Sequence, residues 1–217
     1  MSEIILDISA NTHKNDWNYL QRMLDEVRKA EIAAGNTEKH KIIIKHQLFK
    51  EAGNNMPLDH QVFREAHYYA SCLGYKTTSS VFDLESLKFL LEFDIPFVKI
   101  ANRRDLDPLI GEVPRKIPVY VSYDQININN KADIKMACIS KYPANIEDYE
   151  SVFAKERHLK WGPDIWLTRA ISDHTIGLDL FKKYQPRIWE KHYKLSDSTG
   201  LDAGPFAITP EELREIL

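Results

Sequence analysis

The apolar and polar positions along the chain alternate between two patterns. Short apolar runs rich in β-branched residues predict strands, and apolar residues three or four positions apart predict helices. Strands are expected at Ile4–Ile8, Lys41–His46, Tyr75–Ser80, Phe97–Ala101, Pro118–Ser122, Lys135–Ile139, Ile165–Ile171 and Pro186–Tyr193. Helices are expected at Asn15–Ala34, Asp59–Leu73, Leu84–Phe93, Ile146–Lys155, Thr175–Tyr184 and Thr209–Leu217, with a short one at best at Asp105–Ile110.

A strand-then-helix unit repeated about eight times predicts a parallel sheet. An open doubly wound sheet has the same rhythm, but no Gly-rich phosphate loop follows the first strand, so nothing favours its nucleotide-binding form. The expected fold class is therefore α/β, a compact (β/α)8 TIM barrel formed by residues 1–217 as a single domain. The brief segment Tyr123–Ile134 predicts a shortened or missing helix between the fifth and sixth strands.

Composition narrows the partners and the compartment. The chain has 217 residues, near the lower size limit of a TIM barrel, and its net charge of -3 gives no basic surplus for nucleic acid or a membrane surface. Two cysteines in apolar contexts, Cys72 and Cys138, favour buried thiols over a disulfide. The N-terminus lacks a signal-peptide pattern, and no apolar run approaches the roughly 18 residues of a membrane span. We expect a cytoplasmic protein with neither a nucleic acid nor a membrane as partner.

Polar side chains gather at the predicted carboxyl ends of the strands, where TIM barrels carry their reactive groups. The lysines among them, Lys45 and Lys99, supply point charges for phosphate and carboxylate groups. Two imidazoles on neighbouring strands, His174 and His192, can bind a divalent ion and leave positions open for water and substrate. This chemistry suits a phosphorylated carboxylic acid together with a metal.

Several segments resemble one known family. Ala170-Ile-Ser-Asp-His-Thr175 is similar to the Gly-x-Ser-Asp-His-Thr signature of N-acetylneuraminate (sialic acid) synthases. Trp189-Glu-Lys-His192 resembles their Ile-Glu-[Lys/Arg]-His, Lys45-His-Gln47 their Val-Lys-[Phe/His]-Gln, and Ser79-Ser-Val-Phe82 their Ser-Thr-Pro-Phe. Further matches follow in the same order, so the resemblance covers nearly the whole chain. It extends to the catalytic barrel only, and the family's C-terminal antifreeze-like domain is expected to be absent.

The resemblance implies an activity. Members of this family condense phosphoenolpyruvate with an (N-acetyl) aldose, in a divalent-metal-dependent reaction, to a 2-keto-3-deoxy sugar acid and release phosphate. By this resemblance the chain is a C–C bond-forming synthase, a transferase of carbohydrate biosynthesis. Its partners would be phosphoenolpyruvate and a sugar aldehyde, its cofactor Mn²⁺ or Mg²⁺, and a homodimer is left open as its assembly.

The resemblance also implies roles for individual residues. The metal ligands would be His174 and His192. Catalytic roles fall to Asp7, Glu190 and Tyr142. The substrate-binding residues would be Lys45, Gln47, Ser80, Lys99, Asn102, Ser122, Ser140, Ser172 and Asp202.

The chain departs from the family at three motifs, and these departures leave alternatives open. Asp7 stands where the first-strand motif has Glu, Ala101-Asn-Arg-Arg104 replaces Gly-Ser-Gly-Glu, and Ser122-Tyr-Asp-Gln125 replaces Ser-Thr-Gly-Met. A degenerate, non-catalytic barrel that binds an anionic ligand or a partner protein is the main alternative. A different metal-assisted reaction on a sugar phosphate is another. In a purely structural interpretation, Lys45 and Lys99 merely pair with Asp7 and Glu190.

Overall fold

Eight parallel strands close into a barrel in the order β1 to β8. A computed structural model describes the chain except residues 1, 36–39, 52, 125–131 and 159–169. Each strand pairs with the next in sequence, and β1 pairs with β8. The strands are β1 Ser2–Asp7, β2 His40–Leu48, β3 Lys76–Val81, β4 Val98–Ile100, β5 Val119–Tyr123, β6 Ile134–Cys138, β7 Ala170–Asp173 and β8 Ile188–His192. Closure confirms the predicted (β/α)8 barrel and excludes the open sheet.

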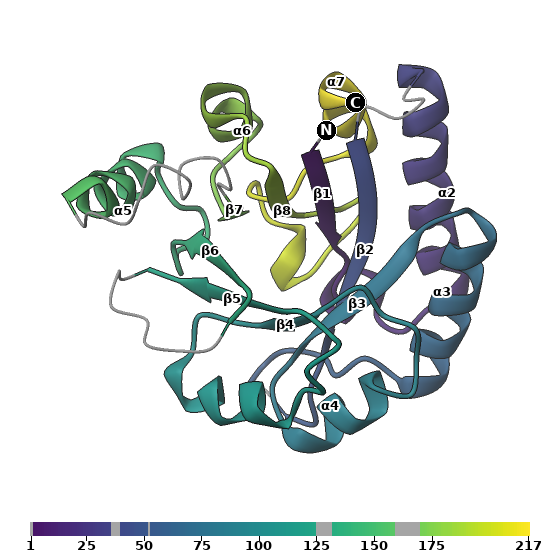
Figure 1. The fold of residues 1–217 in the computed structure, drawn as a ribbon. Helices are drawn as coiled ribbons and strands as arrows, with labels where there is room; N and C mark the ends of the chain where they lie inside the picture. Colours follow the sequence, from purple (N-terminus) through teal and green to yellow (C-terminus); the bar gives the residue numbers. More distant parts are fainter. Residues whose placement is uncertain (1, 36–39, 52, 125–131, 159–169) are drawn as a thin grey trace.

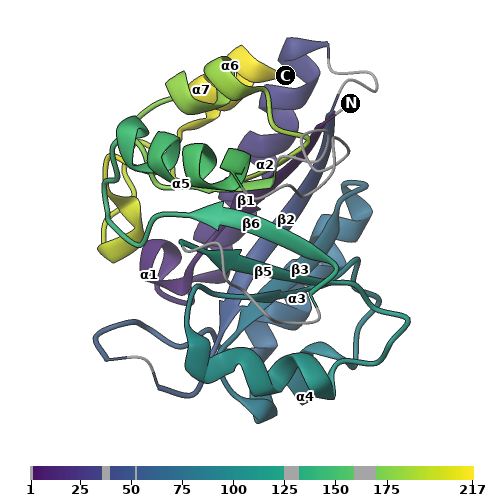
Figure 2. The same ribbon diagram turned by 60° about the vertical axis from the view of Figure 1, so that its left-hand side comes forward.

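Helices surround the barrel, as Figures 1 and 2 show from two sides. The α-helices are α1 Ala10–His13, α2 Trp17–Ala34, α3 His60–Cys72, α4 Leu84–Leu90, α5 Ile146–His158, α6 Asp179–Tyr184 and α7 Pro210–Ile216. Two 3₁₀-helices are η1 Arg104–Glu112 and η3 Leu201–Ala203. The short helix expected after the fourth strand is η1, whereas α1 and η3 were not predicted, because each is a single turn without a periodic apolar face.

Local sequence signals explain where the helices begin and end. The Asp16 side chain accepts hydrogen bonds from the backbone of Asn18 and Tyr19 at the start of α2, and Gly35 ends that helix at a positive φ of 62°. Thr209 and Glu212 form a capping box at the start of α7. These groups satisfy backbone N–H donors that have no partner inside the helix.

The barrel interior is divided into an apolar layer and a polar layer. Since side chains alternate along a strand, residues two apart point to the same side. The lower interior cluster contains Ile5, Ile43, Phe97, Met136 and Ala170. Two residues further along the same strands are Asp7, Lys45, Lys99, Cys138 and Ser172, all buried. The strand period therefore places an apolar plug directly beneath a polar floor. A larger apolar cluster lies between the barrel and its helices.

Two of the sequence expectations fall partly on residues outside the described part, and a third is wrong for one cysteine. Residues 125–131 lie outside the described part, so the shortened helix between β5 and β6 stays a prediction. The seventh strand is described from Ala170, and residues 165–169 of the predicted range are likewise outside. Cys138 is buried as expected, but Cys72 is exposed, because it ends α3 on the helix's solvent side.

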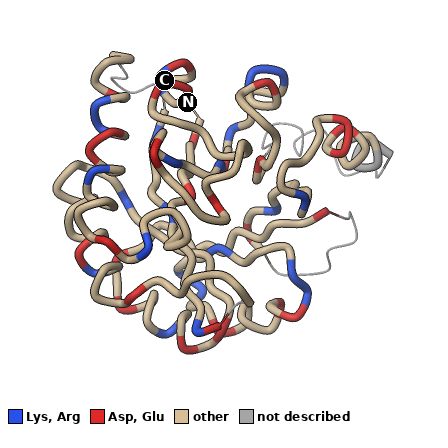
Figure 3. The backbone as a smooth tube through the Cα atoms, turned by 180° about the vertical axis from the view of Figure 1, so that it is seen from behind, with Lys and Arg blue, Asp and Glu red and all other residues tan. Residues whose placement is uncertain are grey.

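The outer surface carries both charge signs. In Figure 3, lysine and arginine positions are interspersed with aspartate and glutamate positions along the tube, with no face of one sign in that view. Among the described helices, none is long and apolar enough to cross a membrane.

Candidate functional site

A cavity of about 630 Å³ opens where the strands end. Every site residue expected from the sequence lines it: Asp7, Lys45, Gln47, Ser80, Lys99, Asn102, Ser122, Ser140, Tyr142, Ser172, His174, Glu190, His192 and Asp202. The cavity wall also includes residues without an expected role: Asn55, Phe82, Ala101, Arg103, Cys138, Leu201 and Phe206. Residues far apart in sequence thus meet in one cavity because parallel strands in a barrel all end on the same face.

Four buried charges of alternating sign form the cavity floor. Lys45 Nζ lies 2.7 Å from Asp7 Oδ2 and 3.9 Å from Glu190 Oε1, and Lys99 Nζ lies 3.6 Å from the same Glu190 oxygen. The strand register brings them together, since Asp7 pairs with Lys45 across β1 and β2. The two lysines and two carboxylates balance each other, as the structural interpretation of the sequence anticipated.

Burial and the neighbouring charges shift the pKa values of the floor residues in opposite directions. Burial alone would lower the pKa of Lys45, but the Asp7 and Glu190 carboxylates outweigh it and raise that pKa. For Lys99, burial is the larger effect and lowers its pKa despite Glu190. Burial would raise the pKa of Glu190, yet Lys45 and Lys99 hold it well below its usual range. Glu190 is therefore an ionised carboxylate at neutral pH.

Hydroxyl groups occupy part of the hydrogen-bonding capacity of the floor. Lys45 Nζ donates to Ser80 Oγ at 3.0 Å, Lys99 Nζ donates to Ser122 Oγ at 2.5 Å, and Ser172 Oγ donates to Glu190 Oε1 at 2.9 Å. Three buried atoms at the cavity have no hydrogen-bond partner among the described residues.

These unpartnered atoms are Asp7 Oδ1, Glu190 Oε2 and His192 Nδ1. Buried polar atoms are normally satisfied, so these three mark positions where a ligand, an ion or water completes the site.

Two histidines stand side by side above the floor, with ring centroids 5.5 Å apart. His174 Nδ1 lies 2.7 Å from the backbone oxygen of Ile139, an arrangement that places the proton on Nδ1 and leaves Nε2 as the free lone pair. Burial, followed by the neighbouring His192, lowers the pKa of His174 to about 3 and keeps its ring neutral. His192 Nδ1 lies 3.7 Å from Asp202 Oδ1.

This pair fits a divalent ion by its chemistry. Two imidazoles bound to one ion at about 2.1 Å place their ring centroids on the order of 5 Å apart, close to the observed separation. A ligand histidine must be neutral and commonly donates its other N–H to a carbonyl, as His174 does. The described part of the chain contains no group of three or more His, Cys, Asp or Glu side chains that could hold a metal. Remaining ligands would have to come from water or substrate.

An aromatic wall flanks the histidines. The ring of Tyr142 lies 4.2 Å from that of His174 and 5.2 Å from that of Phe206, measured between centroids. Tyr142 is 55% exposed, so its ring covers the histidines from the solvent side. Sequence reasoning missed Phe206, because a lone aromatic residue near the C-terminus carries no signal that separates a cavity wall from a core position.

A second buried network lies outside the barrel wall and fixes the loop that carries His174. Lys191 Nζ lies 3.1 Å from Asp173 Oδ1, and Trp189 Nε1 donates to Asp173 Oδ2 at 3.0 Å. Asp173 also accepts from the backbone N–H of Thr175 at 2.7 Å. The carboxylate of Asp173 thus joins the end of β7 to β8 and holds the backbone on both sides of His174.

The departure at Ala101–Arg104 brings Arg103 to the cavity wall and Arg104 beside the cavity residue Asn102. Arg103 lines the cavity, with its guanidinium 6.0 Å from the Phe82 ring centroid and paired with Asp105. Arg104 Nη2 donates to Asn102 Oδ1 at 3.1 Å, and Asn102 Nδ2 donates to Ser140 Oγ at 3.1 Å. The expected substrate-binding residues Asn102 and Ser140 therefore contact each other.

Comparisons with known proteins agree on the barrel. No family model matches the sequence, and no curated protein matches it. Solved structures do match. N-acetylneuraminic acid (sialic acid) synthetase from Leptospira borgpetersenii serovar Hardjo-bovis, in complex with citrate, superposes with a TM-score of 0.72 at 21% identity, over 98% of this chain and 80% of that one.

Two other structures give similar results. The putative spore coat polysaccharide biosynthesis protein E from Chromobacterium violaceum has a TM-score of 0.76 at 17% identity, over 99% of this chain and 72% of that one. A truncated 3-deoxy-D-arabino-heptulosonate 7-phosphate synthase from Thermotoga maritima has a TM-score of 0.63 at 12% identity, over 100% of this chain and 83% of that one. The fold of this chain is therefore the barrel seen in the solved sialic acid synthase and in the spore coat polysaccharide biosynthesis protein.

Proposed function

We propose that this chain catalyses the metal-dependent condensation of phosphoenolpyruvate with an (N-acetyl) aldose to a 2-keto-3-deoxy sugar acid, with release of phosphate. One observation carries the proposal: two buried lysines, a set of hydroxyls and a pair of histidines meet in one cavity. The similarity in fold to proteins described as synthases, and the motif resemblance around His174 and His192, support the same assignment.

The charge balance of the floor explains why an anionic substrate and a cation would bind together. Lys45 and Lys99 are already compensated by Asp7 and Glu190. A phosphate and a carboxylate would add negative charge to a buried site, and uncompensated buried charge is unfavourable. The histidines His174 and His192 would hold Mn²⁺ or Mg²⁺, whose bound form supplies Lewis-acid polarisation and positive charge.

In this proposal the chain's own residues divide the work between two substrates. Lys45 and Lys99 would bind the phosphate and carboxylate of phosphoenolpyruvate, and the other polar donors would fix its orientation. Those donors are Gln47, Ser80, Asn102, Ser122, Ser140 and Ser172. Glu190 and Asp202 would orient the sugar, with Tyr142 beside them.

The chemical step conserves atoms and electrons. The C3 carbon of the enol attacks the aldehyde carbon, water adds at C2, and the C2–O bond to phosphate breaks, which yields the keto acid and inorganic phosphate. Asp7 would move protons, since Asp7 Oδ1 has no partner among the described residues while Asp7 Oδ2 is held by Lys45 and Gln47.

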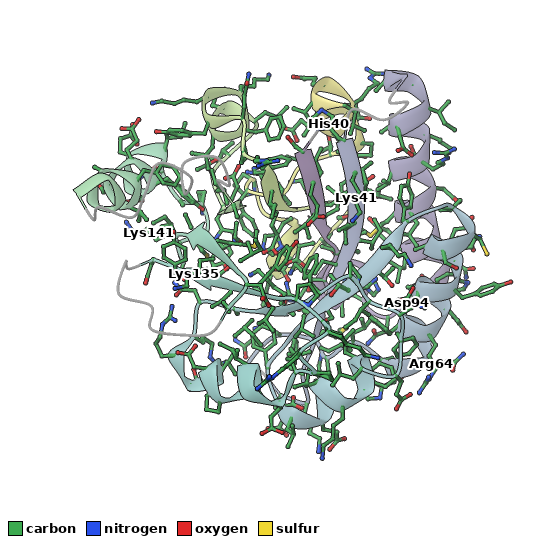
Figure 4. The ribbon with its side chains drawn as sticks, viewed as in Figure 1. His40, Lys41, Arg64, Asp94, Lys135 and Lys141 are labelled. Atoms are coloured by element: carbon green, nitrogen blue, oxygen red, sulfur yellow. The ribbon has the colours of Figure 1, made fainter. Side chains whose placement is uncertain are left out.

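The proposal is tested by phosphate release with each component omitted in turn. Release should require phosphoenolpyruvate, the divalent ion and the aldose together. It should vanish in Lys45→Ala, because the anionic groups of the substrate lose a buried point charge. Lys41→Ala is the matched control: Lys41 lies on the same strand, its side chain is exposed, and it pairs with Glu3 away from the cavity (Figure 4).

A second candidate function, anion binding without turnover, is favoured by the altered first-strand motif, in which Asp7 replaces the glutamate of the resembling family. Phosphoenolpyruvate would then raise the unfolding midpoint, since a ligand that binds only the folded state stabilises it. Protection against heat by phosphoenolpyruvate, with no phosphate release from any aldose in a panel of N-acetylated and simple sugars, would establish this candidate instead.

A further inference from the structure

Asn11 lies in α1, the single helical turn that follows β1, and connects segments from three parts of the chain at the cavity mouth. It is 6% exposed and does not line the cavity. Its Nδ2 donates to Asp202 Oδ2 at 2.6 Å and to Asn55 Oδ1 at 2.9 Å, and its Oδ1 accepts from the backbone N–H of Met56 at 2.9 Å. A carboxylate only accepts and a backbone N–H only donates, so this pattern fixes the orientation of the amide.

The backbone of Asn11 also contacts the turn that carries Asp202. A Cβ on Gly200 would lie 2.1 Å from the backbone oxygen of Asn11, and Gly200 adopts a φ of 105°. Only glycine fits such an approach and such a conformation. The turn that begins at Gly200 therefore sits directly on α1 and delivers Asp202 to the side-chain amide of Asn11.

This arrangement determines where the free oxygen of Asp202 lies. With Oδ2 bound to Asn11, Oδ1 is 3.7 Å from His192 Nδ1, and Asp202 lines the cavity. Hydroxyl groups donate to such an oxygen, whereas phosphate and carboxylate groups are repelled by it. The cavity wall fixed by Asn11 is thus suited to a polyhydroxylated ligand rather than to an anionic one.

We propose that Asn11 is a positioning residue for the acceptor sugar, acting through Asp202. The inference rests on the proposed function for the identity of the two substrates. Asn11 sets the affinity for the aldose, because it fixes the carboxylate that receives the sugar's hydroxyl groups. It has no part in binding phosphoenolpyruvate, whose lysine partners stand on β2 and β4.

The test begins with Asn11→Asp, which preserves size and the bond from Met56. The substitution removes both donated hydrogen bonds and places a second carboxylate beside Asp202. We expect the KM for the aldose to rise about tenfold or more, the effect of losing one charge-assisted hydrogen bond. The Kd for phosphoenolpyruvate, measured by calorimetry with the divalent ion present, should stay unchanged, and kcat should fall less than kcat/KM.

Asn15→Asp is the matched control. Asn15 Nδ2 donates to Pro57 O at 3.0 Å and its Oδ1 accepts from Asp59 N at 3.0 Å, so it secures the same connection between β2 and α3 without contacting Asp202. We expect the KM for the aldose to stay unchanged in this variant. An equal rise of the KM for the aldose in Asn11→Asp and Asn15→Asp would show that the connection between β2 and α3, rather than Asp202, sets this KM. That result would overturn the proposal.

The contact between Asn11 and Asp202 has a test that needs no turnover. In the double variant Asn11→Asp with Asp202→Asn, donor and acceptor are exchanged and the hydrogen bond forms again. The unfolding midpoint should fall in Asn11→Asp and recover in the double variant. Additive losses would contradict the contact. If the wild-type chain releases no phosphate, the proposed function fails, while this comparison still decides whether Asn11 fixes Asp202.

Discussion

Lys45 Nζ lies 2.7 Å from Asp7 Oδ2, and both side chains are almost completely buried on neighbouring strands. Glu190 approaches the same ammonium to 3.9 Å from β8. The shorter aspartate thus pairs with the floor lysine in the position where the resembling family has a glutamate. The structure retains a carboxylate at this place in the cavity despite the altered first-strand motif.

Asp7 variants test whether this carboxylate takes part in the reaction. Asp7→Asn should abolish phosphate release and lower the free energy of unfolding by about 3 kcal/mol, because Lys45 loses the nearer of its two buried carboxylate partners and keeps Glu190 at 3.9 Å. Asp7→Glu preserves the charge and should keep or raise kcat/KM. Rates equal to wild type in Asp7→Asn would remove Asp7 from the mechanism.

The histidine pair is tested by metal binding itself. Replacing both His174 and His192 with Ala should abolish binding of Mn²⁺ measured by calorimetry, since the two imidazoles are the ligands that the described residues offer on this wall. His60 lies away from the cavity and stacks on Phe89, with their ring centroids 3.7 Å apart. Replacing His60 should leave the stoichiometry of Mn²⁺ binding unchanged. Unchanged stoichiometry in the double variant would refute a two-histidine site.

The outer network around Asp173 should contribute to stability and to the placement of His174. Asp173→Asn leaves the ammonium of Lys191 buried without its charged partner, and removal of one partner of a buried pair typically destabilises by about 3–5 kcal/mol. Adding Lys191→Met should restore much of this loss. Chemical denaturation of the single and double variants measures both effects, and equal stability of Asp173→Asn and wild type would exclude the network as a support.

Acid should destabilise the folded chain through buried histidines. Burial lowers the pKa of His13 to about 4 and that of His46 to about 3, from 6.5. The folded state keeps both rings neutral while the unfolded chain takes up protons below pH 6.5, so stability is complete above that pH and declines as the pH falls toward 4. The unfolding free energy of His13→Leu should show a smaller pH slope, by up to about 1.4 kcal/mol per pH unit. A slope identical to that of wild type would contradict a neutral buried His13.

The sequence predicted the barrel because each strand and helix carries its own period. It also predicted the cavity residues, since Lys45, Lys99 and Glu190 all stand at strand ends that converge in any closed parallel barrel. What it could not predict depends on contacts between loops. Nothing in the local sequence of Asn11 indicates that its amide meets Asp202, 191 positions away.

Side-chain direction on the strands follows from their period of two residues. Lys191 and His192 are adjacent in one motif, yet the strand period sends His192 into the cavity and Lys191 to Asp173 outside it. Arg103 is exposed, and it lies at the cavity wall near Phe82 in a loop where no strand or helix period predicts side-chain direction.

In the proposed reaction this cavity joins phosphoenolpyruvate to an aldose with cleavage of the C–O bond to phosphate. It is tested most directly by running the reaction in ¹⁸O-labelled water with the divalent ion and a panel of aldoses, followed by mass spectrometry of both products. We expect a keto acid whose mass equals the sum of both substrates and water less phosphoric acid, formed in equal amount with unlabelled phosphate. Labelled phosphate, or phosphate released without the sugar acid, would contradict it.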